Sequence, residues 1–274
     1  MKTEQTPKVS VIMPAYRQAE YVGDAIRSVL SQTFTDWELL IGDDGSPDNV
    51  AEEVEKVSGG DPRIRFFSFE NRGLSGARNF LAGRAAGIYL LPLDADDMLH
   101  PSYIEKCLAE FNRHPDAAVV YSKWRGFGAS SHVRDIAYTG YRDLLADNSI
   151  FASAMFRKSD FKRIGGYDES MTIGFEDWEF WIRMLDEDSV VLQIPEPLFM
   201  YRRKKESMSV TASRPDKEAR VLRYISEKHS DKYERYYPDR LADIKELYKM
   251  RRRVAKWKRR SIFSRLWYAV TGKF

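Results

Sequence analysis

Three carboxylates directly follow a short apolar run in the middle of the chain. The run is Gly87-Ile88-Tyr89-Leu90-Leu91-Pro92, and the acidic stretch is Leu93-Asp94-Ala95-Asp96-Asp97. Ile88 to Leu93 has the length and the unbroken apolar character of a buried strand in a parallel sheet. The acids therefore lie at the carboxyl end of that strand, where open α/β sheets bind their ligands.

Clustered carboxylates repel one another unless a cation or hydrogen-bond donors compensate their charge. A divalent cation that takes oxygen ligands and bridges substrate phosphates would provide this compensation. The alternative is a solvated acidic turn that caps the helix expected to begin near Pro101. The acidic stretch alone does not decide between the two interpretations.

Strand and helix patterns alternate along the first part of the chain. We expect strands over Lys8–Met13 (ended by Pro14), Trp37–Ile41 and Arg63–Phe69, and helices over Glu20–Ser31, from about Pro47, and from Ser75 to Ala86. This alternation predicts βαβ units, and therefore an α/β, Rossmann-like, mostly parallel sheet flanked by helices. Further along, we expect strands over Ala117–Ser122, Ser149–Phe156, Val190–Ile194 and Leu198–Arg202, a loop over Gly126–Ser131, and a helix over Phe175–Leu185.

Cysteine usage and hydropathy indicate a protein of the reducing cytosol. The first residues are polar and lack the apolar run of a secretory leader, and no run approaches the ~18 apolar residues of a membrane span. Cys107 is the single cysteine, so no internal disulfide can form. It lies on the apolar side of an expected helix, which favours packing over reactivity.

The last residues are strongly basic, although the whole chain has a net charge of only +3. No acid follows Glu246, whereas ten Lys and Arg residues do. We therefore divide the chain into an α/β domain, 1–213, and a helical, basic, amphipathic extension, 214–274. Its expected apolar helix face comprises Ile262, Phe263, Leu266, Trp267 and Val270.

Basic residues beside Trp, Phe and Leu on an amphipathic helix are typical of an interfacial membrane anchor. We expect residues 249–273 to bind a membrane surface and place the protein in the cytoplasm, peripherally on the inner face of the cell membrane. Packing of the extension on a protein surface is the second interpretation. We expect no nucleic-acid partner, because no nucleic-acid-binding motif is present. The oligomeric state is not readable from the sequence.

Several short motifs occur in a fixed order between residues 8 and 209. They are Val9-Ser10-Val11-Ile12-Met13-Pro14-Ala15-Tyr16, Ser28-Val29-Leu30-Ser31-Gln32-Thr33, Asp43-Asp44-Gly45-Ser46, Gly76-Ala77-Arg78-Asn79, Leu93-Asp94-Ala95-Asp96-Asp97, Gly165-Gly166-Tyr167-Asp168, Glu176-Asp177 and Tyr201-Arg202. As an ordered set, they closely resemble the family 2 inverting glycosyltransferases of the GT-A fold. The resemblance implies transfer of a sugar from a nucleotide-diphosphate donor, usually a UDP-sugar, with inversion at the anomeric carbon.

The resemblance also implies roles for individual residues. Tyr16 would pack on the base, Asp44 would hydrogen-bond it, and Asp94 would contact the ribose. Asp96 would hold the Mg2+ or Mn2+ that bridges the diphosphate. The remaining members of the implied nucleotide-sugar site are Pro14, Ala15, Arg78, Ala95 and Lys204. For Tyr16 and Arg78, strand-end packing and a surface helix charge are the respective structural alternatives.

Catalysis in this family requires a base that takes the proton of the acceptor hydroxyl. The resemblance assigns that role to Asp177, with Glu176 and Trp178 as acceptor-binding candidates; an acidic pair that favours the helix dipole is the structural alternative. Trp181 is expected to be buried. Lys204 stands where many relatives carry a metal-binding histidine, and a protonated lysine cannot ligate. We therefore expect Lys204 to contact the diphosphate, the alternative being a solvated loop lysine.

The sequence thus predicts a non-processive glycosyltransferase, because it lacks the Gln-x-x-Arg-Trp segment with which processive relatives grip a polymer. A membrane location favours a lipid-linked or surface-polysaccharide acceptor. A nucleotidyltransferase is the competing enzyme class, but it needs a Gly-rich loop after the first strand, where Pro14-Ala15-Tyr16-Arg17 stands. The non-enzymatic alternative is a nucleotide-sugar-binding module recruited to the membrane by its extension.

Overall fold

The computed structural model describes residues 6–129, 131–134, 136–204, 212 and 214–258. These residues form two compact units, divided between Tyr224 and Ile225. The domain boundary expected near residue 213 stays a prediction. The expected apolar helix face at 262–270 lies outside the described residues.

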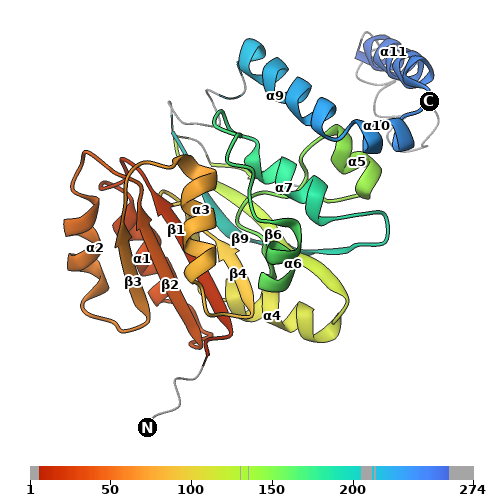
Figure 1. Ribbon diagram of the computed structural model, residues 1–274. Helices are drawn as coiled ribbons and strands as arrows, with labels where there is room; N and C mark the ends of the chain where they lie inside the picture. The colour runs from red at the N-terminus through yellow and green to blue at the C-terminus, as the bar shows by residue number, and fades with distance from the viewer. Residues whose placement is uncertain (1–5, 130, 135, 205–211, 213, 259–274) are drawn as a thin grey trace. The chain divides into compact units, whose positions relative to one another are not determined.

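The first unit is an α/β structure built on one mixed sheet (Figure 1). The strand order is β3-β2-β1-β4-β8-β6-β9-β5, and β7 pairs with β6 at one side. The strands are β1 (Val9–Ala15), β2 (Trp37–Asp43), β3 (Ile64–Ser68), β4 (Tyr89–Pro92), β5 (Met98–Leu99), β6 (Ala117–Gly128), β7 (Val133–Arg134), β8 (Met155–Arg157) and β9 (Val190–Arg203).

Helices fill the connections of this unit. They are α1 (Val22–Leu30), α2 (Val50–Ser58), α3 (Gly73–Arg84), α4 (Tyr103–Arg113), α5 (Tyr141–Ala146), α6 (Lys158–Ile164), α7 (Glu176–Met184) and the first part of α9 (Pro215–Lys228). Figure 1 shows α3 crossing one face of β1 and β4. The second unit contains the end of α9, then α10 (Ser230–Tyr236) and α11 (Arg240–Lys258).

The predicted parallel βαβ arrangement is confirmed for the first four strands. β1 lies between β2 and β4 and is parallel to both, and β2 is parallel to β3. All residues of β1, β2 and β4 are buried, because helices cover both faces of such a sheet. Consequently the carboxyl ends of β1, β2 and β4 meet at one edge.

Two details of these strands differ from the sequence expectation. Pro14 does not end the first strand: it lies inside β1 opposite Gly42 of β2, beyond the Ile12–Pro92 pair at which β4 stops pairing with β1. Proline is tolerated there because β1 has only one neighbouring strand at that point. Ile88 is not part of the buried strand; it precedes β4 and is 51% exposed.

The second half of the sheet differs more from expectation. The two expected closing strands are one strand, β9, which pairs in parallel with β6 through register shifts. Gly126–Gly128 belong to β6 instead of a loop. A Cβ on Gly128 would lie 3.0 Å from the backbone oxygen of Arg203, so this glycine permits the close approach of β9. Of the strand expected over Ser149–Phe156, only Met155 and Phe156 lie in β8.

Other predictions about packing are confirmed. Cys107 and Trp181 are fully buried, and burial raises the pKa of the Cys107 thiol, which makes it unreactive. His100 and His114 are exposed.

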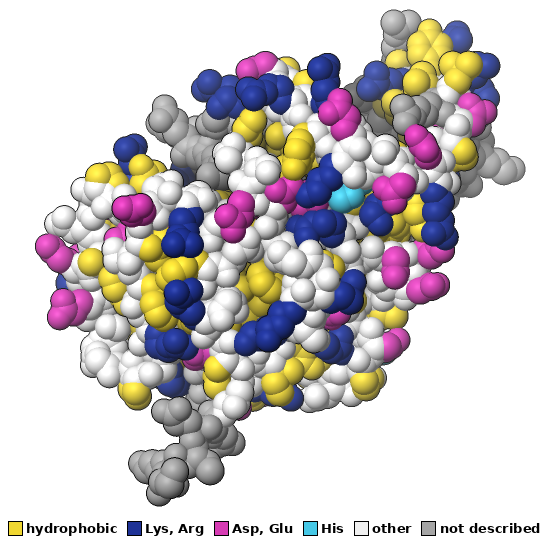
Figure 2. Space-filling view, in the orientation of Figure 1, with side chains coloured by type: hydrophobic (Ala, Val, Ile, Leu, Met, Phe, Trp, Pro, Cys, Tyr) yellow, Lys and Arg dark blue, Asp and Glu magenta, His cyan; other side chains and the backbone are white. Residues whose placement is uncertain are grey.

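Among the described residues, no helix combines the length and the apolar composition needed to cross a bilayer. In Figure 2, Lys and Arg side chains are scattered over the visible face between acidic and apolar ones.

Candidate active site

Tyr16, Asp44 and Asp94 follow three neighbouring strands at the same edge of the sheet. The Asp44 amide donates to the backbone oxygen of Ala15 (2.9 Å), and the Leu93 amide donates to that of Ile12 (3.0 Å). The ends of β1, β2 and β4 therefore stay in register as far as the turns that carry these side chains. These three side chains therefore follow strand ends at one edge of the sheet.

Tyr16 projects from the end of β1 and is 42% exposed. The next residue, Arg17, has a left-handed backbone with φ of 56°, and its guanidinium lies 5.2 Å from the centroid of the Tyr16 ring. A non-glycine residue in this region costs about 1–2 kcal/mol. Ser46 holds the turn, because its Oγ accepts a hydrogen bond from the Arg17 amide (3.1 Å). The ring is thus presented by a strained and tethered turn.

Asp44 is buried, and its carboxylate orders the turn before α3. Its Oδ1 accepts a hydrogen bond from the Arg72 amide (2.6 Å), while Asn71 Nδ2 donates to its backbone oxygen (2.9 Å). Burial raises the pKa of Asp44, and the donation from the Arg72 amide partly offsets this. The predicted hydrogen bond of Asp44 to a base stays a prediction.

Each acid of the stretch 94–97 has a different partner. Asp94 Oδ1 accepts from Arg78 Nη2 (2.7 Å), Asp96 Oδ2 pairs with Lys204 Nζ (2.7 Å), and Asp97 Oδ1 accepts from the Arg202 amide (2.7 Å). Helix α4 begins later, after Ser102, and takes no cap from these acids. Two of the acids are therefore paired with cations and the third accepts a backbone amide, and none of them caps a helix. Ala95 between them is buried.

Arg78 is buried and joins two distant parts of the chain. Its Nη1 donates to Glu176 Oε1 (2.6 Å), its Nη2 donates to Asp94, and its guanidinium lies 5.3 Å from the Tyr167 ring centroid. Burial opposes the charge of Arg78, but Asp94 and Glu176 together raise its pKa above the usual value. With only 1% of its side chain exposed, Arg78 is a positioning residue in this structure. Its predicted contact with the nucleotide stays a prediction.

Asp177 is the second residue of α7, next to the carboxylate that Arg78 holds. Its Oδ1 accepts from the Trp178 amide (2.8 Å), and Asn148 also donates a hydrogen bond to it. Burial and the neighbouring charge of Glu176 raise the pKa of Asp177 to about 7, although Arg78 acts in the opposite direction. A carboxylate with this pKa is suited to act as a general base near neutral pH.

Phe175, the residue before α7, has a left-handed backbone with φ of 63° and packs against Trp178. Trp178 is only 4% exposed, and its indole nitrogen donates to the backbone oxygen of Leu144 (2.6 Å). The indole therefore packs inside the protein, and its exposure gives no support to the predicted acceptor contact. Glu176 is buried as well, with its carboxylate in the Arg78 ion pair.

Two of the sequence motifs interlock through Asn79. Its Nδ2 donates to the backbone oxygen of Tyr167 (2.9 Å), and its Oδ1 accepts from the Tyr167 amide (2.8 Å). Gly166, with φ of 80°, lies so close that a Cβ would come within 2.6 Å of Asn79 Oδ1. The segments 76–79 and 165–168 are thus one structural unit, and Arg78 and Asn79 act from neighbouring positions of α3.

Lys204 follows the end of β9 and contacts three side chains. Besides Asp96, its ammonium donates to Gln18 Oε1 (3.1 Å) and lies 4.2 Å from the Tyr21 ring centroid. Arg202 fixes the strand end, because its Nε donates to the backbone oxygen of Asp96 (2.7 Å). Sequence reasoning gave no role to Gln18, Arg202, Asn79 or Asn148. Only Arg202 and Asn79 stood within the quoted motifs.

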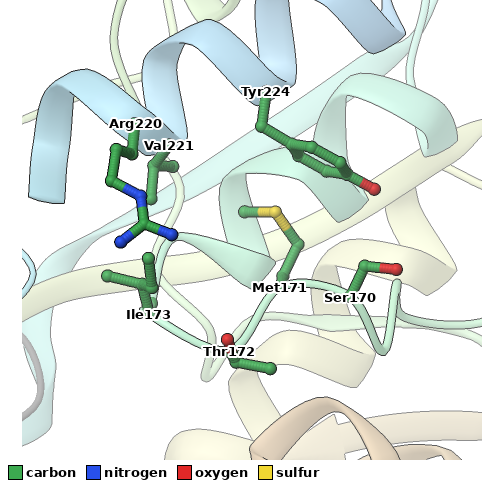
Figure 3. A pocket seen from close by; sticks show the side chains of 8 residues that line it. Ser170, Met171, Thr172, Ile173, Arg220, Val221 and Tyr224 are labelled. Atoms are coloured by element: carbon green, nitrogen blue, oxygen red, sulfur yellow. The ribbon is translucent and has the colours of Figure 1, made fainter.

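A pocket of about 240 Å³ borders the loop that leads to Asp177 (Figure 3). The loop contributes Met171, Ile173 and neighbouring residues, and α9 contributes Arg220, Val221 and Tyr224. The Tyr224 hydroxyl donates to Asp168 Oδ2 (2.6 Å), which ties α9 to the segment 165–168. The pocket lies within the first unit.

Asp96 fits a divalent cation only together with other ligands. Among the described residues, no three His, Cys, Asp or Glu side chains form a group that could hold a metal by themselves. Asp96 is about one-fifth exposed, and its present partner is an ammonium. One carboxylate with phosphate oxygens and waters is an arrangement that Mg2+ accepts. The donor set therefore fits a cation that arrives with a diphosphate.

The family model described as "Glycosyl transferase family 2" matches residues 10–169, which include the strand ends, the acidic stretch and the segment 165–168. The chain belongs to this family. A hyaluronan synthase of Pasteurella multocida is 41% identical over 118 residues, which are 43% of this chain and 12% of that synthase. The chain thus spans only a small part of the length of that polysaccharide synthase.

Solved glycosyltransferases have the same fold. S. aureus TarS 1–349 in complex with UDP-GlcNAc has a TM-score of 0.69 at 20% identity, covering 80% of this chain and 65% of TarS. The mannosyltransferase PcManGT from Pyrobaculum calidifontis, in complex with GDP-Man and Mn2+, has a TM-score of 0.55 at 18% identity, covering 76% and 60%. The predicted GT-A fold of this family 2 glycosyltransferase is confirmed.

Proposed function

We propose that this protein transfers a single sugar, with inversion, from a nucleotide-diphosphate sugar to an acceptor hydroxyl, and that the donor is a UDP-sugar. The observation that carries the proposal is the ion pair between Arg78 and Glu176. Through Arg78 it links Asp94, in the acidic turn after β4, to Glu176, the residue before Asp177. A donor group and a base on opposite sides of one anomeric carbon are what inverting transfer requires.

The donor would lie across the strand ends. Tyr16 would stack on the base and Asp44 would lie beside it, at the ends of β1 and β2; Pro14 and Ala15 supply the backbone there. Asp94, about one-third exposed, would accept from the ribose hydroxyls. The Asp96 and Lys204 side chains, about one-fifth exposed, would lie at the diphosphate.

Asp177 would act on the acceptor. Its carboxylate takes the proton of the attacking hydroxyl as the oxygen forms its bond to the anomeric carbon, and the bond from that carbon to the diphosphate breaks. The nucleoside diphosphate leaves with the electron pair, and Asp177 ends protonated. A Mg2+ or Mn2+ ion held by Asp96 and the diphosphate would stabilise the charge of the leaving group.

A membrane location would supply the acceptor, which we propose to be a lipid-linked or surface-polysaccharide glycan. Helix α11 has two neighbouring sides of opposite character. Leu241, Ile244 and Tyr248 are 61%, 61% and 63% exposed along one side. Lys245, Lys249 and Arg252 follow helical spacing along the next side and are also exposed. Exposed apolar residues beside a basic stripe favour binding to an anionic membrane surface.

The proposed transfer is tested by the release of UDP. A panel of UDP-sugars is first screened for the donor that raises the melting temperature of the protein, since ligands of the folded state stabilise it. UDP release is then measured for the wild type, Asp96→Ala and Asp177→Ala. We expect both variants to lose transfer. Asp177→Ala should still bind the donor, and wild-type transfer by either variant would refute the role proposed for that residue.

A further inference from the structure

Asp96 already holds a cation, and that cation is supplied by the protein. Lys204 Nζ lies 2.7 Å from Asp96 Oδ2 and 3.1 Å from Gln18 Oε1. The lysine and aspartate side chains are 19% and 21% exposed, so the pair is shielded but reachable from solvent. Because a partly buried ion pair is screened less than a surface pair, this contact is a substantial electrostatic feature of the site.

Contacts with neighbouring residues fix the position of the Lys204 side chain. Arg202, two residues before Lys204, donates from its amide to Asp97 and from its Nε to the backbone oxygen of Asp96. The end of β9 is therefore hydrogen-bonded to the acidic turn. The Tyr21 ring, 4.2 Å from Nζ, lies against the ammonium from the side of α1. The Lys204 head group is therefore held from the acidic turn, from the segment after β1 and from the start of α1.

The other two acids of the stretch have partners of their own. Asp94 is paired with Arg78, and Asp97 is buried and receives the Arg202 amide. Asp96 is thus the acid whose charge is balanced by Lys204. A divalent ion on the same oxygen would stand within a few ångströms of the ammonium, and like charges at that distance repel strongly. The ammonium and a divalent ion therefore compete for Asp96 Oδ2.

We propose that Lys204 is the resident cation of this site: it takes the place on Asp96 that a divalent ion would take, and it binds the diphosphate of a nucleotide without any metal. The inference rests on the proposed function. An ammonium has three donors. Asp96 and Gln18 accept two, and the third is available to a phosphate oxygen, for which lysine is an effective point-charge partner. A divalent ion then binds Asp96 only when Lys204 leaves it.

Calorimetric titration with UDP, in EDTA and in excess Mg2+, tests this inference on the full chain. The wild type should bind UDP in EDTA with an affinity within about threefold of that in Mg2+. Lys204→Met should bind at least about tenfold more weakly in EDTA, since a hydrogen bond to a charged group is lost. In Mg2+ this variant should recover most of the affinity, because Asp96 is then free for the ion.

Mn2+ binding, followed by the electron paramagnetic resonance signal of the free ion, gives a second readout without turnover. Without UDP, Lys204→Met should bind Mn2+ more tightly than the wild type by at least about tenfold. Lys204→Arg keeps the charge and should retain metal-free UDP binding. Lys56→Met removes an exposed lysine paired with Glu53 on α2 and should behave as the wild type.

The results of these titrations distinguish a failure of this inference from a failure of the proposed function. If the wild type binds UDP only in Mg2+, and Lys204→Met binds it equally well, the inference is overturned while the proposed function stands. If the folded wild type binds UDP in neither condition, the proposed function itself fails. Thermal unfolding establishes that each variant is folded; should Lys204→Met unfold, Lys204→Gln replaces it in the same comparison with Lys204→Arg.

Discussion

Arg78 Nη1 lies 2.6 Å from Glu176 Oε1, so a buried ion pair joins α3 to the first residue of α7 across 98 positions of sequence. The same guanidinium holds Asp94 after β4. One side chain therefore holds both Asp94 and Glu176, the residue before the proposed base Asp177. The two ion pairs account for the full burial of a charged arginine in α3.

Replacing Arg78 by Met should destabilise the protein by about 3–5 kcal/mol, because Asp94 and Glu176 would be left without their cation. Arg78→Lys should recover only part of the loss, since a single ammonium lacks the fork that spans both carboxylates. Denaturant unfolding measures both. Arg84→Met on the exposed side of α3 is the control and should cost less than about 1 kcal/mol. Equal losses in the free energy of unfolding at positions 78 and 84 would contradict the role of Arg78 as the cation shared by Asp94 and Glu176.

The pKa of Asp177 sets the pH dependence of transfer. With a pKa of about 7, the carboxyl group of Asp177 is half deprotonated near neutral pH, so kcat/KM should rise with pH through about 7. Because the charge of Arg78 lowers this pKa, the rise should move to higher pH in Arg78→Lys if the lysine lies farther from Asp177. A rate that stays flat from about pH 5 to pH 8 in the wild type would exclude Asp177 as the base.

Asp177→Asn should lower kcat by about 10²–10⁴-fold and leave UDP affinity within about threefold.

The Asp177→Asn substitution should also change the stability of the protein in a pH-dependent way. The raised pKa means that the folded state binds a proton that the unfolded state has released, so wild-type stability falls as pH rises from about 4 to about 7. The variant lacks this loss. Its melting temperature should exceed that of the wild type at pH 8 by more than at pH 5, and a constant difference would count against the raised pKa of Asp177.

Gly166→Ala tests the interlock between α3 and the segment 165–168. The new Cβ would meet Asn79 Oδ1 at 2.6 Å on a backbone with φ of 80°, so stability should fall by more than about 1 kcal/mol. Gly83→Ala in α3, the helix that carries Asn79, is the control, because a Cβ at Gly83 would meet no atom within 4 Å. That substitution should instead stabilise the protein by about 0.5–1 kcal/mol. The opposite signs distinguish a local clash from a general intolerance of substitution.

The basic extension is tested by flotation with vesicles. The full chain should float with anionic vesicles and lose this binding in high salt, since the attraction of basic side chains is screened. A chain that ends at Lys245 should remain in the soluble fraction. Neutral vesicles are the control for non-specific adsorption. Equal flotation of the long and the short chain would remove the membrane proposal.

The fold was largely predictable where local pattern and tertiary environment agree. β1, β2 and β4 are short apolar runs that helices cover on both faces, so their composition alone indicates a parallel sheet. Gly126–Gly128 misled the prediction, because glycine there serves the close approach of β9 and not a turn. The three-residue strand β8 is set by its antiparallel partners β4 and β6, which lie far from it in sequence.

The sequence allowed the candidate site residues to be named, but it did not indicate their contacts. The order of the motifs pointed to Asp94, Asp96 and Asp177. No local pattern indicates that Arg78 is buried between Asp94 and Glu176, or that Lys204 lies on Asp96, because these pairs form only when the sheet is assembled. Trp178 illustrates the reverse case: a helix-start tryptophan beside the proposed base is buried, and its indole is bonded to Leu144.

A crystal structure of the protein with UDP bound tests the central proposal most directly. We predict a uracil ring against Tyr16, a ribose within hydrogen-bond distance of Asp94 and a diphosphate contacting Lys204. Asp177 should face the terminal phosphate of the UDP. UDP bound anywhere other than the edge formed by the ends of β1, β2 and β4, or a diphosphate separated from Asp177 by packed protein, would contradict it.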